Sequence, residues 1–566
     1  MSVLERLTEG IINRDLSKEG AALYSKWEKT GLLEGMGTDR SRQTMAVLLE
    51  NQAKELLREA STMQGGDVEG FASVAFPIVR RVFGGLIAND LVSVQPMSLP
   101  SGLIFFLDFT LNSSRLGSEA GDSVYGGGAV GIQITGGVSL TGENAEESFY
   151  ALNNGYSSPT SSSGTFTPTI IASGTVGGTW FGTRAADGDS LVRYDPDISG
   201  SFAAVGTIDY SELTSGQFNV KDFVTVTLCD GGVFPDLFPL LSGGLQVRRL
   251  TRLDPDDATK VLLVVTQTGS IGLATASLLS GDRASFVIDD NFVPGGAGGL
   301  GNIVGDVLWG LEDQINIPEI DIKVDSIPVT AKTKKLKAKW TPELAQDLNA
   351  YHNMDAEVEL TSILSEHIAL ELDQEILEDL VKGATAQTLY WSRRPGKFLN
   401  RTTGVALGTG LADFTGNVSE WYETLAETIN DVSAQIHRKT LRGGANFVVC
   451  SPEVANVLEF TAGFRGSVTH DDDRGTIGTM KVGSLSKKFD VYVDAYFPRN
   501  VILVGRKGSS FLESGYVYAP YVPLQMTPTI FGVEDFVPRK GVMTRYAKKM
   551  VRPDMYGLVI VEDLLG

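Results

Sequence analysis

Histidine, the side chain that most often carries acid–base and metal chemistry near neutral pH, is scarce in this sequence. The 566 residues contain four, His352, His367, His437 and His470. No two of them have the spacing of a zinc-binding HExxH helix. His367 falls on a long predicted helix, where a packed or half-exposed side chain is the simpler interpretation. The histidines therefore indicate neither a catalytic site nor a metal site.

Two short motifs contain residue types that bind ligands elsewhere. Gly296, Gly298 and Gly301 spell the GxGxxG of dinucleotide-binding loops, but a poor helix former follows and no βαβ unit surrounds them. Residues 471–473, Asp-Asp-Asp, could hold a cation, although a solvated acidic loop is the favoured interpretation. GxSxG, Walker and Cys–His motifs are absent. We therefore expect no catalytic residue, no cofactor and no metal, and a protein that is not an enzyme.

The composition is that of a globular, acidic chain. Hydrophobic residues make up 42% and charged residues 21%, and the formal charge is 48 − 69 = −21. This balance argues against a basic nucleic-acid-binding surface; it suits a wall around a polyanion, although many acidic enzymes share it. Cys229 and Cys450 form no CxxC signature, so we expect two reduced core thiols. No signal peptide and no apolar run of about 18 residues occurs, which predicts synthesis in a cytoplasm.

The regular elements are organised around one long helical stretch. Thr341 and Pro342 predict the start of a first helix, and Asp355 predicts the cap of a second helix over residues 355–382 that stops at Gly383. The second helix carries an apolar residue at every fourth position: Leu360, Leu364, Ile368, Leu372, Ile376 and Leu380. Such a stripe winds partly round a helix, which favours a spine that changes neighbours as it crosses a sheet. The ordinary buried face of a large domain is the alternative.

Composition divides the first half of the chain into four regions. Residues 1–70 are predicted as a charged, helical N-terminal arm, and residues 71–110 as a short helix, a turn and strands. Residues 103–183 are rich in Gly, Ser and Thr, which predicts a long extended loop or, as the alternative, a flexible linker. Residues 184–306 hold short β-branched runs between turn residues and are predicted as an inserted β domain.

The second half is predicted to alternate helices and strands. Residues 307–415 contain a strand-like run and the long helix. Residues 416–530 begin with a helix from Ser419 and continue with the strand NFVVC and the helix SPEVANVLEF, which is α/β construction. Residues 531–566 are predicted as C-terminal strands.

Three blocks over roughly half of the chain resemble one protein family. The first block contains ELAQDL, MDAE and ELTSIL, and the second contains VRR, LIAND and VQPMSLPSG. The third runs from NFVVCSPEVANVL through VGRKG and GYVYAPYVPL to MTRYA. These motifs stand in the same order in the T-even-type major capsid proteins of large contractile-tailed bacteriophages, and the chain resembles that family.

The resemblance implies an α+β, Hong Kong 97-type capsid fold. Its peripheral domain would begin in residues 71–110 and continue in 307–415 with the spine helix, and its axial α/β domain would be residues 416–530. The extended loop and the N-terminal arm complete that fold. The inserted β-rich domain, residues 184–306, has no residue-level match to the family.

The resemblance also implies processing of the N-terminal arm. In that family the arm guides assembly, and a prohead protease cuts after Glu in a (Leu/Ile)-x-Glu context. Residues 57–59, Leu-Arg-Glu, fit this context and place a candidate cut between Glu59 and Ala60. Residues 48–50, Leu-Leu-Glu, fit it too. Helices rich in Leu and Glu produce such patterns by chance, so an intact terminus is the alternative.

The expected function is a structural one. We expect self-assembly into hexamers, and into pentamers as a second oligomer, to form an icosahedral head shell that encloses the phage genome without sequence-specific binding. Expected partners are copies of the chain itself, portal, vertex and decoration proteins, scaffold and prohead protease, with no membrane. The expected location is the virion, preceded by the host cytoplasm. Arg80 and Arg81 are candidates for charge contacts with a neighbouring subunit; a solvated helix face is the alternative.

Three other functions stay open at this point. A vertex capsid paralogue would form only pentamers, and an encapsulin-like shell would enclose a cargo enzyme. An enzyme would need a polar constellation in a pocket, of which the sparse histidines give no sign. Some shells of this fold cross-link Lys to Asn, but no reactive pair is identified here.

Overall fold

The computed structural model describes residues 16–33, 39–60, 86–112, 162–165, 169–209, 227–229, 244–267, 283–286, 319–407, 414–466, 480–508 and 515–564, with residues 120, 121, 123, 124, 142, 145 and 513. The chain forms two compact units. Unit 1 comprises Met1–Asp108, Tyr125–Gly137 and Lys323–Gly566, and unit 2 comprises Phe109–Val124 and Val138–Ile322.

Unit 1 contains the long helix that the sequence predicts over residues 355–382. It is α8, Ala356–Gly383, and Asp355 caps it by accepting a hydrogen bond from the Glu357 amide at 2.9 Å. The preceding helix α7, Pro342–His352, is capped by Thr341. Five residues of the predicted stripe are buried, namely Leu364, Ile368, Leu372, Ile376 and Leu380. The stripe therefore faces the core along most of α8.

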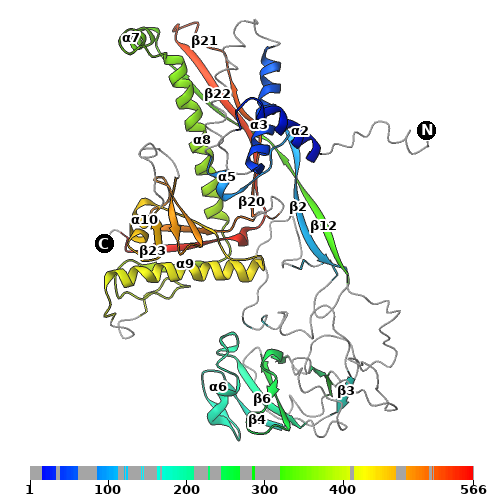
Figure 1. The fold of residues 1–566 in the computed structure, drawn as a ribbon. Coiled ribbons are helices and arrows are strands. Elements are labelled where there is room, and N and C mark those ends of the chain that lie inside the picture. The colour runs from blue at the N-terminus through cyan, green and yellow to red at the C-terminus, as the bar shows by residue number, and fades with distance from the viewer. Residues whose placement is uncertain are drawn as a thin grey trace, which may run out of the picture. The chain divides into compact units, whose positions relative to one another are not determined.

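A mixed sheet of unit 1, antiparallel except for one pair of strands, lies against α8 (Figure 1). Its strands are β1 (Ser93–Val94), β20 (Tyr516–Met526), β22 (Pro538–Met550) and β13 (Lys332–Lys339), in that order, with β21 (Ile530–Phe531) also paired to β22. Tyr516, Tyr518 and Tyr546 are buried between this sheet and α8. We call it the peripheral sheet.

Two helices near the N-terminus cover part of the same core. They are α2, Leu16–Glu28, and α3, Asp39–Ala60, and Trp27, Met45 and Leu49 are buried in the core that α8 shares. The sequence alone predicts a removable or flexible arm here. In the structure the apolar residues of α2 and α3 pack inside unit 1 and form one wall of that core.

A two-stranded ribbon leaves the peripheral sheet. It consists of β2, Ser101–Leu111, and β12, Ile320–Thr330, which pair with each other and with no other strand among the described residues. Ile104 of β2 is buried with Val517 and Val551 of the peripheral sheet. The short helix α5, Ala88–Leu91, precedes β1.

A second sheet of unit 1 is of mixed α/β construction. Its order is β14, β23, β19, β15, β18, β17 and β16, and we call it the axial sheet. In that same order the strands span Thr388–Ser392, Tyr556–Glu562, Val501–Gly505, Phe447–Cys450, Phe489–Val493, Met480–Leu485 and Phe464–Gly466. Helices α9, Val418–Thr440, and α10, Pro452–Glu459, contribute to the core on one face of it, and alternate strand residues such as Phe447 and Leu503 join the α8 core on the other.

Helix α9 approaches the axial sheet very closely. The predicted apolar residues Trp421, Leu425, Ile429, Val432 and Ile436 are all buried. A Cβ on Gly557 of β23 would lie 2.5 Å from a methyl carbon of Val432, so only glycine permits this approach. Figure 1 shows α9 running along the sheet beside β23.

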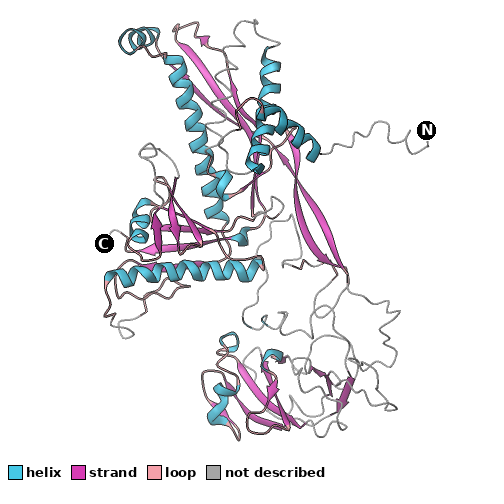
Figure 2. Cartoon of the chain, viewed as in Figure 1, coloured by secondary structure: helices cyan, strands magenta, loops and turns pink. Residues whose placement is uncertain are grey.

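Unit 2 is a small β structure (Figure 2). One sheet has the order β5, β4, β6, β10, β8, with β9 also paired to β10, and a second has the order β3, β11, β7. The bounds of β3 to β11 are Ser162–Thr165, Thr169–Thr175, Trp180–Phe181, Phe202–Asp209, Thr227–Cys229, Gly244–Gln246, Arg252–Leu253, Lys260–Gln267 and Arg283–Phe286. The helix α6, Gly188–Leu191, is one turn long.

Strand pairing joins regions that the sequence divides. The sequence separates residues 103–183 from 184–306, but β4 pairs with β6, so one sheet uses both regions. On the other side of β4, glycine permits the close approach of β5, since a Cβ on Gly174 would lie 2.3 Å from the Thr179 carbonyl oxygen. Likewise β14, in the region 307–415, belongs to the axial sheet, and β20, in the region 416–530, to the peripheral sheet. Among the described residues no helix is long and apolar enough to span a membrane.

Candidate interaction surfaces

The predicted chemical residues do not come together in the described part of the chain. His352, His367 and His437 are exposed on three different helices, α7, α8 and α9. His470, the GxGxxG glycines (Gly296, Gly298, Gly301) and residues 471–473 lie outside the described residues. Within the described ranges, no three His, Cys, Asp or Glu residues are grouped as metal ligands.

Cys450 lies in the centre of the axial sheet and is fully buried. Burial raises the pKa of its thiol to about 12, so the thiol stays protonated and unreactive at neutral pH. This agrees with the predicted core thiol. The side chain of Cys229 lies outside the description.

The structure describes the backbone at the candidate protease site but not the two arginines predicted to contact a neighbouring subunit. Glu59 and Ala60 are the last two residues of α3, and their side chains lie outside the description. Arg80 and Arg81 lie outside the described residues altogether, so their subunit contacts stay a prediction. The second protease pattern, residues 48–50, is in the middle of α3, where Leu48 and Leu49 are buried.

A polar seam fastens α8 to the peripheral sheet. Glu375 of α8 receives hydrogen bonds from Tyr546 and Lys548 of β22, both at 2.5 Å, and lies 2.9 Å from Lys334 of β13. Burial raises the pKa of Glu375, but these hydrogen bonds outweigh burial and lower the pKa to about 2. Asp379, one turn later, lies 2.6 Å from Lys548. The seam therefore holds α8 in one register on the sheet.

A buried charge cluster lies where β2 leaves the body of unit 1. Asp108, 1% exposed, lies 4.0 Å from Arg442 after α9 and 3.8 Å from Arg552 after β22. Arg442 also lies 3.1 Å from Glu513. The cluster joins the base of the ribbon to segments that follow both the axial helix and the peripheral sheet.

One face of the ribbon carries apolar side chains that are exposed in the described part of the chain. Leu103 and Phe105 of β2 are 51% and 40% exposed, and Val324 of β12 is 58% exposed. Side chains alternate along a strand, so Leu103 and Phe105 lie on the face opposite the buried Ile104. Two-stranded ribbons are marginally stable in water unless another element packs on them. This face is therefore a candidate docking surface, and its sequence signal is the i, i+2 spacing of Leu103 and Phe105 in β2 and of Ile322 and Val324 in β12.

A second exposed apolar group, which we call the apolar tip, lies at the α7 end of unit 1 (Figure 1). Its residues are Tyr351 of α7, Met354 between the two helices, Val358 of α8, Ile530 and Phe531 of β21, and Val533 and Phe536 of the turn between β21 and β22. Glu357 ties the two parts together, because it accepts hydrogen bonds from Lys540 at 2.6 Å and Thr529 at 2.8 Å. Val533 is 91% exposed, which makes the tip a candidate for protein–protein contact.

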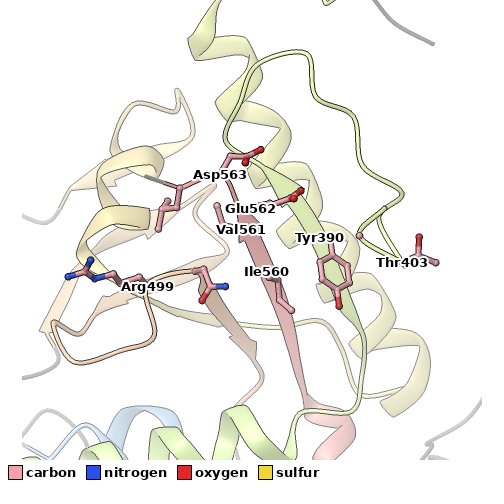
Figure 3. Close-up of a pocket in the computed structure, with 10 residues that line it drawn as sticks. Tyr390, Thr403, Arg499, Ile560, Val561, Glu562 and Asp563 are labelled. Atoms are coloured by element: carbon pink, nitrogen blue, oxygen red, sulfur yellow. The ribbon is translucent and has the colours of Figure 1, made fainter. Parts of the chain in front are cut away.

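One open pocket lies beside the last strand of the axial sheet (Figure 3). It has a volume of about 580 Å³, and Tyr390 and Ile560 of the paired strands β14 and β23 line it together with Arg499 and Glu562. Arg499 bonds to Glu453 at 3.3 Å, and Glu562 lies 3.1 Å from Lys397. The charged groups of Arg499 and Glu562 are thus paired with residues outside the pocket lining, Glu453 and Lys397. Among the residues that line the pocket, no nucleophile lies beside a base.

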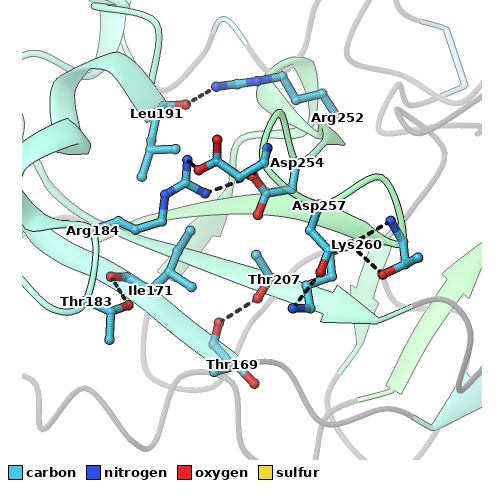
Figure 4. A network of polar contacts seen from close by, with 12 residues as sticks. Thr169, Ile171, Thr183, Arg184, Leu191, Thr207, Arg252, Asp254, Asp257 and Lys260 are labelled. Carbon is cyan, nitrogen blue, oxygen red and sulfur yellow. Dashed lines mark hydrogen bonds and ion pairs between the residues drawn. The ribbon is translucent and has the colours of Figure 1, made fainter.

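Unit 2 is held by ion pairs between its loops (Figure 4). Arg184 lies 2.8 Å from Asp254 and 2.6 Å from Asp256, and Arg252 donates to the Leu191 carbonyl at 2.6 Å. Lys260 lowers the pKa of Asp257 through a close ion pair. These contacts satisfy charges within unit 2 and leave no arrangement suited to catalysis in the part shown.

Comparison with known proteins identifies the family to which the chain belongs. Residues 68–211 and 263–563 match the family "Major capsid protein Gp23". The chain belongs to this Gp23 major capsid protein family. This membership confirms the predicted resemblance to T-even-type capsid proteins and the predicted capsid function.

Individual relatives agree with the family. The major capsid protein of Enterobacteria phage T6 is 25% identical over 94% of this chain and 94% of its own length. That of Vibrio phage KVP40 is 33% identical over 40% of this chain, an alignment that spans 45% of the phage protein. The capsid vertex protein of Enterobacteria phage T4 is 24% identical over 41% of this chain and 53% of its own length.

Solved structures with partial likeness include Mycobacterium phage Adephagia. That chain is 13% identical, with a TM-score of 0.29, over 46% of this chain and 81% of the Adephagia chain. This likeness is too slight to support an argument about the fold. The fold class, mixed helix and sheet, follows from the helices and strands of the chain.

Proposed function

We propose that the chain assembles with copies of itself into hexamers, and into pentamers as a second oligomer, that tile an icosahedral phage head. In this proposal unit 1 has the Hong Kong 97-type fold, with α8 as its spine, the axial sheet as its axial domain and the β2–β12 ribbon as the base of its extended loop. Unit 2 is the inserted β-rich domain. The shell would enclose DNA without reading its sequence, consistent with a formal charge of −21.

The apolar face of the ribbon is the observation that carries the proposal. Leu103, Phe105 and Val324 are large apolar side chains that stay exposed on one face of the ribbon, while Ile104 packs against unit 1 on the other face. A neighbouring copy would remove this surface from water, at about 25 cal/mol per Å² of apolar area, and would offset the entropy lost in ordering the ribbon. A protein that acted alone would have no use for such a face.

The ribbon can be tested directly by assembly. Phe105→Asp places a charge on the apolar face, whereas Phe105→Leu keeps an apolar side chain there and serves as the control. We expect the purified wild type and the Phe105→Leu variant to form shells by negative-stain microscopy, and Phe105→Asp to stay as folded, unassembled subunits. Shells of unchanged number and size from Phe105→Asp would contradict the proposed role of the ribbon.

The apolar tip supports a second contact between copies. Val533→Asp removes its most exposed apolar side chain, and Glu534→Gln, in the same turn, changes charge without changing the apolar surface. Analytical ultracentrifugation should show fewer assembled species for Val533→Asp alone. Equal loss in both variants would point to the turn and not to its apolar side chain.

Processing of the N-terminal arm belongs to the same proposal. We propose that a prohead protease cuts between Glu59 and Ala60 during maturation, because this pattern is at the end of α3 and helix ends open more readily than their middles. The pattern at residues 48–50 is disfavoured by the burial of Leu48 and Leu49. Mass spectrometry of the protein from mature particles would show the new N-terminus at Ala60.

Further partners follow from a shell role and remain proposals. They are scaffold and prohead protease during assembly, in the host cytoplasm, and portal, vertex and decoration proteins in the virion. A capsid vertex protein matches 41% of the chain and the major capsid protein of phage T6 matches 94%, so a shell protein that forms only pentamers is not the favoured assignment. Counting hexamers and pentamers in assembled particles separates the two, and an encapsulin-like shell would contain a cargo protein in place of DNA.

A further inference from the structure

The turn that ends α6 in unit 2 holds two consecutive non-glycine residues in the left-handed backbone conformation. Arg193 and Tyr194 have φ angles of 55° and 51°. The Tyr194 amide closes the turn by donating to the Asp189 carbonyl at 2.9 Å. A residue with a Cβ is less favourable in this conformation than glycine. The chain therefore keeps an arginine and a tyrosine where glycine would be less strained, and such strain is concentrated at functional sites.

The buried residues on either side of this turn fix its position. Val192 is fully buried in the core of unit 2 together with Trp180. The indole nitrogen of Trp180 donates to Asp189 Oδ1 at 2.9 Å, which holds the start of the turn. In contrast, Arg193 is exposed and Tyr194 is 74% exposed. The turn is thus a fixed platform that presents these two side chains to solvent.

A second guanidinium group lies beside the same turn. Arg252 Nη2 donates to the Leu191 carbonyl at 2.6 Å, two residues before Arg193 (Figure 4). Its Nη1 donates to the Leu250 carbonyl at 3.2 Å, so two backbone groups orient the side chain. Burial lowers the pKa of Arg252, and the positive charge of Arg193 lowers it further. Two positive groups are therefore held close to each other.

The carboxylates nearest to this pair are held by another arginine. Arg184 lies 2.8 Å from Asp254 and 2.6 Å from Asp256. Asp254 offsets part of the repulsion felt by Arg252 from a distance. Within the described ranges, neither Arg193 nor Arg252 forms an ion pair with a carboxylate. An oxyanion placed between the two guanidinium groups would relieve their repulsion.

We propose that the guanidinium groups of Arg193 and Arg252 form a binding site for an oxyanion, the carboxylate or phosphate group of a partner molecule. The planar fork of a guanidinium matches both groups with paired hydrogen bonds. The exposed ring of Tyr194 would contact the part of the ligand that carries the oxyanion. The site belongs to unit 2 and does not depend on the proposed self-assembly.

Isothermal titration calorimetry of the full chain at fixed ionic strength tests the site. The probes are inorganic phosphate and a tetraglutamate peptide, with tetraglutamine as the neutral control. Arg193→Gln removes one guanidinium from an exposed position and should weaken binding at least about tenfold. Lys260→Gln removes one positive charge elsewhere in unit 2 and should leave the affinity unchanged.

The two probes also identify the source of the oxyanion. Binding of both probes would support the shared chemistry, and binding of one alone would show which group the site takes. Absence of binding for both, or the same affinity in Arg193→Gln and in the wild type, would overturn the proposal.

Arg193→Gly separates a binding role from a structural one. Glycine relieves the left-handed strain and removes the guanidinium, so hydrogen exchange in β4 and β6 should be no faster than in the wild type. Binding of the probe should nevertheless weaken at least about tenfold, and Arg193→Lys, which keeps the charge without the fork, should retain part of the affinity. Wild-type affinity in Arg193→Gly would show that this side chain does not hold the oxyanion.

Discussion

The hydroxyl group of Tyr546 donates a hydrogen bond of 2.5 Å to Glu375, joining the middle of β22 to the middle of α8. The same carboxylate also lies within 2.5 Å of Lys548. A single acidic side chain thus connects the long helix to the sheet beneath it. A capsid subunit must transmit force between neighbours, and this connection would let α8 and the peripheral sheet move as one body.

The free energy of unfolding should depend on pH through the ionisation of the Glu375 carboxylate. Burial raises and hydrogen bonds from Lys548, Tyr546 and Lys334 lower the pKa of Glu375, with a net fall from 4.5 to about 2. A depressed pKa stabilises the fold above the unfolded value of 4.5 and loses that contribution as the pH falls towards 2. Glu375→Gln should therefore lower the free energy of unfolding by about 1–3 kcal/mol at pH 7 and by much less near pH 2.

Glu371→Gln is the matched control for that experiment. Glu371 is on the same helix and also faces Lys334, but at 3.4 Å and with a side chain that is 52% exposed. Its substitution should change stability by less than about 1 kcal/mol at either pH. Chemical denaturation across the pH range measures the free energy of unfolding of both variants. An equal loss of free energy for Glu375→Gln at pH 7 and pH 2 would mean that the ionised carboxylate does not stabilise the contact between α8 and the sheet.

Removing the charge of Asp108 alone should strongly destabilise the fold, because its buried arginine partners would stay charged. Asp108→Asn leaves the buried guanidinium groups of Arg442 and Arg552 with less compensating charge, and should lower the free energy of unfolding by about 3–5 kcal/mol. Arg552→Met added to Asp108→Asn should recover part of this loss, because one buried positive charge is removed. A double-mutant cycle by chemical denaturation would show strictly additive effects if the groups were independent.

Limited proteolysis should discriminate between Glu50 and Glu59 of α3. Glu59 is one residue from the end of the helix, whereas Glu50 is held by Lys26 and Trp27 beside the buried Leu49. A Glu-specific protease should cut after Glu59 at least about tenfold faster than after Glu50. Glu59→Gln should abolish the early fragment and Glu50→Gln should leave it unchanged; an early cut after Glu50 would show that α3 is not packed as described.

Unit 2 offers a local test of packing. A Cβ on Gly188 would lie 2.2 Å from the ring of Trp180, so Gly188→Ala should destabilise unit 2 by about 1–3 kcal/mol. Hydrogen exchange should then speed up in β4, β6 and β10 and stay unchanged in α8 and β22. Equal acceleration in both sets of peptides would mean that the two units unfold together.

Local sequence patterns were sufficient for the helices of unit 1. Thr341 and Asp355 are caps whose side chains bond to backbone two or three residues away, and the four-residue spacing of Leu372 and Ile376 marks one face of a helix. Such signals need only a short stretch of chain. The family resemblance depended likewise on short ordered motifs, and it identified the capsid class correctly.

Only the tertiary structure decided which surfaces are covered and which are left bare. Asn51 meets Tyr521 across 470 residues of sequence, and Asp108 meets Arg442 and Arg552, pairings that no local periodicity contains. The sequence predicted a removable or flexible N-terminal arm without indicating that α3 packs in the core of unit 1, and it divided at residue 183 a sheet that β4 and β6 share. Chain topology brings such residues together, because burial depends on what lies opposite a side chain and not on its neighbours along the chain.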